Sequence, residues 1–95
     1  MTDIPAIASR LTIIGAINVK DAGKNEDDSC GRIHTGLGKW THIAALGVER
    51  SLTKLGLVEV RGKHDGLFWT PLGKEVGAYV RANWDKLKFR DGRKR

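Results

Sequence analysis

The sequence predicts an α+β fold in which helices flank a short two-stranded β-hairpin. Apolar residues from Ile4 to Val19 recur at the spacing of one helix face. Residues 57–61 (LVEVR) alternate apolar and polar side chains, and residues 67–70 (LFWT) follow after a segment rich in turn-forming residues. An amphipathic pattern then starts at Pro71. A helix, a hairpin and a further helix in one short chain define the predicted class.

The first helix is expected over residues 4–19, with Pro5 in its first turn, where proline is tolerated. It should end before Asp21, because residues 20–31 (KDAGKNEDDSCG) lack apolar periodicity and are rich in Gly, Asp, Asn and Ser. Residues 20–31 are therefore predicted to form a mobile loop. Its acidic residues do not have the spacing of a calcium-binding loop.

Two interpretations of residues 32–55 remain open, because three glycines interrupt this segment. The preferred one is a continuous helix from Lys39 to Leu55. The alternative is a short helix, Thr41 to Leu46, that turns at Gly47 into a second helix. The continuous helix has an inward face of Thr41, Ala44, Ala45, Val48, Leu52 and Leu55, and an outward face of Lys39, Ile43, Leu46, Arg50 and Lys54.

The C-terminal half is easier to interpret. Gly56 is expected to end the middle helix, and residues 62–66 (GKHDG) suit the tight turn of the hairpin. Thr70 is the predicted N-cap of the last helix, with Pro71 in its first turn. The apolar stripe of this helix is predicted to consist of Leu72, Val76, Tyr79, Val80, Trp84 and Leu87.

Two glycines lie one turn apart on the last predicted helix, at positions 73 and 77. Glycine lets another backbone approach closely, at a cost in helix stability. This surface is therefore expected to pack either in the core or in a homodimer formed through the C-terminal helix.

The length and composition predict one domain, residues 1–89, followed by a basic tail at residues 90–95. The lone Cys30 cannot form an internal disulfide. The N-terminus lacks a basic segment followed by a long apolar run, and no apolar stretch approaches the roughly 20 residues that span a bilayer. A soluble, cytoplasmic protein with no membrane association is the expectation.

The charge distribution favours a polyanionic partner. The chain has 17 Lys and Arg residues against 11 Asp and Glu, a formal charge of +6. Acidic residues concentrate in segment 21–28 and basic residues in segment 81–95. A net positive charge speeds the encounter with nucleic acid. Roughly half of the excess positive charge is expected to lie in the C-terminal tail rather than on a surface that recognises a partner.

Residues 51–76 (SLTKLGLVEVRGKHDGLFWTPLGKEV) resemble winged-helix transcriptional regulators of the MarR and PadR kind. The resemblance implies a winged helix with three or more helices, a short two-stranded wing and a C-terminal helix. The chain departs from those regulators in three ways. It has no recognisable second helix before Thr41, its wing is shorter, and the long dimerisation helices are missing.

The resemblance also implies how such a protein would act. The helix before the wing would enter the major groove of double-stranded DNA as the recognition helix, and the wing would lie along the backbone. The chain is then a small DNA-binding transcriptional regulator or accessory factor. The implied contacts to phosphates and guanine edges are Lys39, His42, Arg50 and Lys54 on the helix, and Arg61, Lys63 and His64 beside or in the wing.

The alternative is a protein-interaction module that docks on a host protein or nucleoprotein complex, such as an inhibitor or adaptor encoded by a phage or mobile element. Trp69 and Trp84 fit the inward stripes of the hairpin and the last helix, so both are expected in the core. Phe68 falls on the opposite side of its strand. The predicted contact residues of this alternative are Trp40, Ile43, Leu46 and Phe68.

The residue patterns do not favour enzyme, metal or cofactor chemistry. Cys30 and His34 form one near pair, but no second pair has zinc-ligand spacing. Residues 36–39 (GLGK) lack the preceding glycine and the following Ser or Thr of a phosphate-binding loop. We therefore expect a binding protein without cofactors rather than an enzyme.

Overall fold

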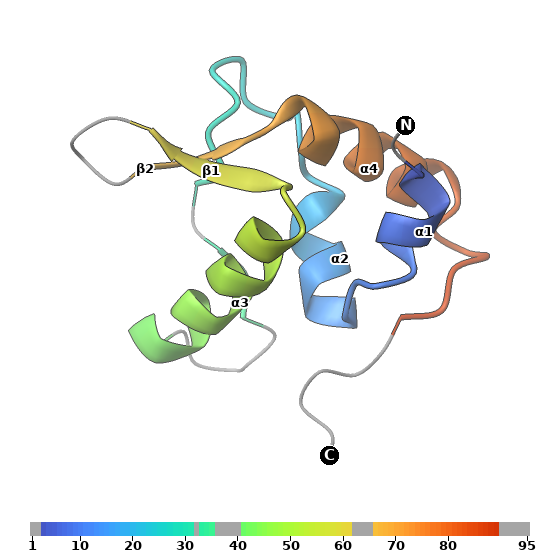
Figure 1. The fold of residues 1–95 in the computed structure, drawn as a ribbon, viewed down its shortest axis with the longest axis horizontal. Helices are drawn as coiled ribbons and strands as arrows, with labels where there is room; N and C mark the ends of the chain where they lie inside the picture. Colours follow the sequence, from blue (N-terminus) through green and yellow to red (C-terminus); the bar gives the residue numbers. More distant parts are fainter. Residues whose placement is uncertain (1–2, 32, 36–40, 62–65, 90–95) are drawn as a thin grey trace.

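The computed structural model describes residues 3–31, 33–35, 41–61 and 66–89 (Figure 1). In this part of the chain, the helices α1, α2 and α4 pack together, while α3 and the hairpin extend to one side of them. This arrangement confirms the predicted α+β class. The helices are α1 (Ile4–Ala8), α2 (Ile13–Val19), α3 (His42–Lys54) and α4 (Pro71–Ala82), and the strands are β1 (Val58–Arg61) and β2 (Gly66–Trp69).

The prediction of one helix over residues 4–19 is wrong, because the chain breaks between α1 and α2. The Ser9 hydroxyl donates to the Ala6 carbonyl at the end of α1. The Thr12 hydroxyl accepts from the Gly15 N–H and so forms a new N-cap. Leu11 is buried between the two helices. The apolar spacing thus describes one buried face that is shared by two short helices.

Helix α3 runs without a break through Gly47, which confirms the continuous helix and excludes a turn at that position. It begins at His42, because the side chain of Thr41 accepts from the Ala44 N–H as N-cap. Its buried face carries Ala45 and Leu52. At its end Gly56 has a φ of 79°, in the left-handed region that glycine adopts most readily.

The two predicted strands pair as a hairpin, and the observed register places Val58 opposite Trp69 and Val60 opposite Leu67. Since side chains alternate along a strand, these four residues share one face and Phe68 lies on the other. The hairpin also pairs with part of the segment predicted to be a loop. The Cys30 N–H donates to the Leu67 carbonyl, and the Trp69 N–H donates to the Asp28 carbonyl. Segment 28–30 therefore forms a short edge beside β2.

Helix α4 begins as predicted, with the Thr70 side chain accepting from the Gly73 N–H and Pro71 in the first turn. It ends before the last two residues of its predicted apolar stripe. Asn83 is its C-cap, so Trp84 and Leu87 lie beyond the helix, where both are partly buried against the core. None of the described helices is long and apolar enough to cross a membrane.

The two glycines of α4 allow the helix to approach two carbonyl groups. A Cβ at Gly73 would overlap the Leu57 carbonyl oxygen, and a Cβ at Gly77 would overlap the Val19 carbonyl oxygen. Both glycines are buried within the chain. The glycine surface of α4 thus packs in the core, which is one of its two predicted roles. A homodimer through α4 stays a prediction, and it would have to use another face of the helix.

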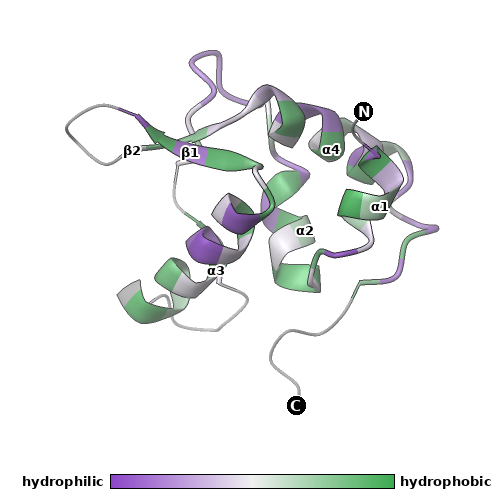
Figure 2. Cartoon of the chain, in the orientation of Figure 1, coloured by the Kyte–Doolittle hydropathy of each residue, from purple (hydrophilic) through white to green (hydrophobic). Residues whose placement is uncertain are grey.

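The core lies where α1, α2 and α4 meet the ends of α3 and β1. Figure 2 shows apolar residues on these helices, whereas hydrophilic residues occupy the last turns of α3. The larger side chains that are fully buried come from α2, α3 and α4, from the link between α1 and α2, and from the residue before β1. They are Leu11, Val19, Leu52, Leu57, Val76 and Val80.

We predict that Gly73→Ala destabilises the protein, because the added methyl group meets the Leu57 backbone, which cannot move independently. The free energy of unfolding should fall by about 1–3 kcal/mol, the usual cost of overpacking a core. Urea denaturation followed by circular dichroism measures it. Gly47→Ala is the matched control: nothing in the described chain lies within 4 Å of the added Cβ. It should raise the same free energy by up to about 1 kcal/mol, and equal effects of the two variants would contradict this account.

Candidate nucleic-acid interface

One face of α3 projects into solvent along the whole helix. Ile43, Gly47, Arg50 and Lys54 follow one another at steps of three or four residues, which places them in a row. All four are exposed, and the Ile43 side chain is 83% exposed. We call this row the α3 ridge. The opposite face of the helix is anchored in the core by Leu52, so the orientation of the ridge is fixed by packing.

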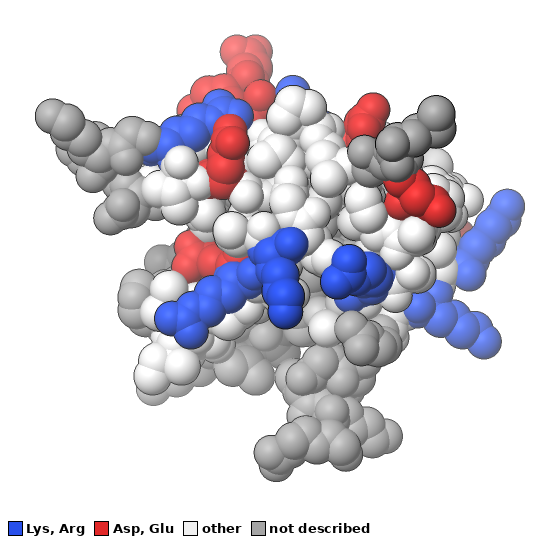
Figure 3. All heavy atoms as spheres, in the orientation of Figure 1, with Lys and Arg blue, Asp and Glu red and all other residues white. Residues whose placement is uncertain are grey.

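The cations of the α3 ridge are not neutralised inside the protein. Among the described residues, no ion pair or side-chain hydrogen bond involves Arg50 or Lys54. Figure 3 shows Lys and Arg atoms in a band over α3 that continues toward the loop between α1 and α2. A group of acidic side chains lies farther up the same face, over the loop of residues 20–31. The solvent face of α3 thus carries positive charge, with Glu49 beside it, and other Lys and Arg residues lie elsewhere on the molecule.

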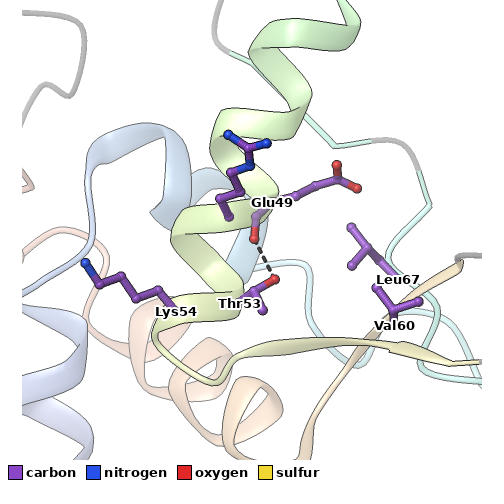
Figure 4. A pocket seen from close by; sticks show the side chains of 6 residues that line it. Glu49, Thr53, Lys54, Val60 and Leu67 are labelled. Atoms are coloured by element: carbon purple, nitrogen blue, oxygen red, sulfur yellow. Dashed lines mark hydrogen bonds between the residues drawn. The ribbon is translucent and has the colours of Figure 1, made fainter.

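A groove separates α3 from the hairpin (Figure 4). Its volume is about 370 Å³. Val60 and Leu67 reach into it from the hairpin, while Lys54 extends away from the strands. Val60 is 58% exposed, although it shares the inward face of its strand, because the hairpin extends beyond the core. The residues that line this α3–hairpin groove are Glu49, Arg50, Thr53, Lys54, Val60 and Leu67.

The Thr53 hydroxyl donates to the Glu49 carbonyl at 2.7 Å, within the helix. This bond holds the hydroxyl against the helix backbone. The Glu49 side chain lines the groove as well and adds a negative charge beside Arg50. The groove thus has an apolar wall on the hairpin and a charged wall of mixed sign on α3.

Arg61 differs from the two cations of the α3 ridge. Its Nε donates to Glu59 Oε2 at 2.6 Å, and its guanidinium lies 4.9 Å from the centre of the Phe68 ring. These residues occupy the hairpin face opposite Val60. The charge of Arg61 is shared with Glu59, and Phe68 is partly buried rather than fully exposed.

The other predicted contact residues have different places. Ile43 is exposed, as the continuous helix predicts, whereas Leu46 is partly buried. His42 is the first residue of α3. Lys39, Trp40, Lys63 and His64 lie outside the described residues.

Two residues of the α3 ridge and the α3–hairpin groove were not predicted from the sequence as part of a binding surface. Val60 is one of the apolar residues of the alternating strand, and alternation cannot show where the core ends. Gly47 was treated as a possible helix break, and the signal for its place on the α3 ridge is its helical spacing from Ile43 and Arg50.

Behind the α3–hairpin groove, Cys30 is half-buried. Burial, and then the charge of Glu49, raise the pKa of its thiol to about 12. The thiolate is the nucleophilic form, so the raised pKa predicts that Cys30 reacts slowly near neutral pH. Among the described residues, no three His, Cys, Asp or Glu side chains gather in a way that would hold a metal ion.

A second recess lies between the end of α2 and α4, with a volume of about 390 Å³. Lys20, Lys24 and Arg81 line it. Arg81 donates to the Lys20 and Ala22 carbonyls at 2.7 and 3.0 Å, and Lys20 lies 4.2 Å from the Trp84 ring centre. Arg81 therefore satisfies carbonyl groups at the C-terminal end of α2, which accounts for a cation there.

Comparison of the chain with protein-family models, curated proteins and solved structures gives no significant match.

We predict that Cys30 in the folded protein reacts slowly with iodoacetamide from pH 7 to pH 9, compared with the urea-unfolded chain, because its raised pKa suppresses the thiolate. Glu49→Gln should speed the reaction by removing the nearby negative charge. The same shift affects stability. The folded state favours the neutral thiol, so this contribution is complete below the ordinary pKa of 9.0 and is lost as pH rises toward about 12. Mass spectrometry measures alkylation, and equal rates for the folded and unfolded chains would contradict the assignment.

Proposed function

We propose that the protein binds double-stranded DNA, with α3 in the major groove and the hairpin beside the sugar–phosphate backbone. The observation that carries the proposal is the pair Arg50 and Lys54, exposed and unpaired among the described residues, on the solvent face of a helix whose other face is fixed in the core. Arginine and lysine in such a position recognise guanine edges and phosphates.

The dimensions of α3 suit this role. Its 13 residues span about 20 Å at 1.5 Å per residue. The major groove of B-DNA is about 12 Å wide and admits one α-helix. The chain joins α3 to β1 through Leu55, Gly56 and Leu57, so the hairpin must start next to the C-terminal end of the inserted helix. A hairpin that starts there supports the proposal that it would lie along the DNA backbone beside the groove.

The order of elements supports a winged-helix interpretation of the fold. A helix leads directly into an antiparallel hairpin, as the resemblance of residues 51–76 implies. Segment 28–30, between α2 and α3, pairs with β2 and widens the small sheet at the base of the wing. The sequence has no recognisable second helix before Thr41. In the described part of the segment before Thr41, residues 33–35 are likewise not helical.

Within this proposal, the α3–hairpin groove receives part of one DNA strand. Val60 and Leu67 offer an apolar wall for a deoxyribose, and Lys54 offers charge for an adjoining phosphate, while Arg50 reaches a base edge. Lys63 and His64 remain proposed backbone contacts of the wing together with Arg61, whose charge is shared with Glu59. The protein would act as a small transcriptional regulator or accessory factor.

We predict that Arg50→Ala and Lys54→Ala each weaken duplex DNA binding by about 5- to 100-fold, the range for lost guanine or phosphate contacts. Fluorescence anisotropy with labelled duplex and single-stranded DNA, from about 50 to about 300 mM salt, measures the affinity and its salt dependence. Lys24→Ala is the matched control, because its side chain is 76% exposed and lies outside the interface. It should change affinity less than about 2-fold.

A truncation after Phe89 separates the domain from its basic tail in the same titration. Loss of affinity in the truncated chain alone, with Arg50→Ala and Lys54→Ala unchanged, would show that the tail and not α3 binds DNA. Wild-type affinity that does not depend on salt would contradict binding through phosphates.

A second candidate function is a protein-interaction module, and the exposure of Ile43 and Val60 favours it. These are the large hydrophobic residues that the described structure leaves most exposed. Exposed apolar side chains at a groove are typical of protein contacts. Under this alternative, Ile43→Ser and Val60→Ser abolish binding to the protein partner, while wild-type chain shows no salt-dependent affinity for DNA.

A further inference from the structure

Gly47 lies in the middle of the α3 ridge, where no contact among the described residues requires a glycine. An added Cβ would meet no atom of the described residues within 4 Å, and Gly47 is not among the described glycines with a positive φ. It therefore differs from Gly73 and Gly77, which backbone contacts require, and from Gly56, which its φ requires. Glycine inside an exposed helix lowers stability relative to alanine. A contact with a partner would account for a glycine at this exposed position.

The neighbours of Gly47 on the α3 ridge project beyond it on both sides. Ile43 lies one turn before it and Arg50 one turn after it, and both are exposed. The ridge thus has an apolar side chain, a gap without a side chain, and a cation. The gap allows the backbone of α3 to approach a partner closely between two projecting side chains.

This pattern matches the edges of base pairs in the major groove. The thymine methyl group is an apolar contact, and the guanine N7 and O6 atoms accept hydrogen bonds from arginine. Ile43 and Arg50 are separated by seven residues, or about 10 Å along the helix axis. At about 3.4 Å per base pair, that distance corresponds to roughly three base pairs.

We propose that Gly47 is the point of closest approach between α3 and duplex DNA, with Ile43 against a thymine methyl group and Arg50 on a guanine edge about three base pairs away. The inference rests on the proposed DNA-binding function and specifies the sequence that this same surface reads. Lys54, one turn beyond Arg50, contacts the phosphate backbone at the end of the helix.

The first experiment compares stability with affinity. Wild type, Gly47→Ala and Gly47→Leu are titrated with duplexes that the wild type selects from a random-sequence pool, and their Tm values are measured by circular dichroism. Gly47→Ala should raise Tm by about 2–8 °C and weaken binding, and Gly47→Leu should weaken binding by about tenfold or more, within the range for lost base-edge contacts. Ala78→Leu, at an exposed position of α4, is the control and should leave affinity unchanged.

The outcomes separate a functional glycine from other possibilities. A raised Tm with lost affinity supports the proposal. A raised Tm with unchanged affinity overturns it, and so does a lowered Tm, which would indicate a structural role. If wild-type protein binds no duplex at low salt, the proposed DNA-binding function fails and this inference fails with it. If wild type binds and the Gly47 variants bind equally well, this inference alone fails.

The second experiment tests the base contacts directly. Replacing each thymine of the selected duplex in turn by uracil, which lacks the methyl group, should weaken wild-type binding about 4-fold at one position. The Ile43→Ala variant should not distinguish the two duplexes. Replacing a guanine about three base pairs away by 7-deazaguanine should likewise weaken the wild type but not Arg50→Ala. A penalty that persists in these variants, or a wild type that never distinguishes the modified duplexes, overturns the assigned contacts.

Discussion

The position of the Leu57 backbone against α4 is the constraint on which the arrangement of the molecule depends. Leu57 donates its N–H to the Leu52 carbonyl at the end of α3, and its own carbonyl accepts from the Thr70 N–H at the start of α4. Gly73 lets α4 lie directly against that carbonyl. One buried residue thus connects α3, the base of the hairpin and α4. The direction of the α3 ridge follows from this junction, because the helix cannot rotate without breaking it.

A second close contact secures the other end of α4. Gly77 lies against the Val19 carbonyl, and Arg81, one turn later, donates to the Lys20 and Ala22 carbonyls. These contacts hold α2 against α4 and satisfy carbonyl groups that the end of α2 leaves without helical partners. The helical side of the molecule is therefore fixed by backbone contacts as well as by apolar packing, while α3 and the hairpin extend away from it. A surface supported in this way is preorganised for binding, which limits the entropy lost when a partner docks.

The sequence predicted the C-terminal half well and the N-terminal half less well, for a physical reason. The Thr70 N-cap, the pairing of the two hairpin strands and the two glycines of α4 are local signals, and local hydrogen bonds or backbone sterics enforce each of them. The break between α1 and α2 leaves the buried spacing of Leu11 intact, so apolar periodicity cannot reveal it. The exposure of Val60 depends on where the core ends, which is a tertiary property. Pairing of Arg61 with Glu59 depends equally on side-chain conformations that no spacing specifies.

The glycines of this chain fall into two groups: those that the described fold requires and one that it does not. Gly56 is explained by its left-handed φ, and Gly73 and Gly77 by the carbonyls that press against them. Each of these residues is accounted for within the monomer, so none of them points to a partner. Among the described residues Gly47 has neither cause, and it lies between an exposed isoleucine and an arginine without an ion pair in that part of the chain. A helix position that lowers stability and has no packing or backbone reason in the described structure is where a role in binding is best tested, because the stability and the affinity of a variant can then change in opposite directions.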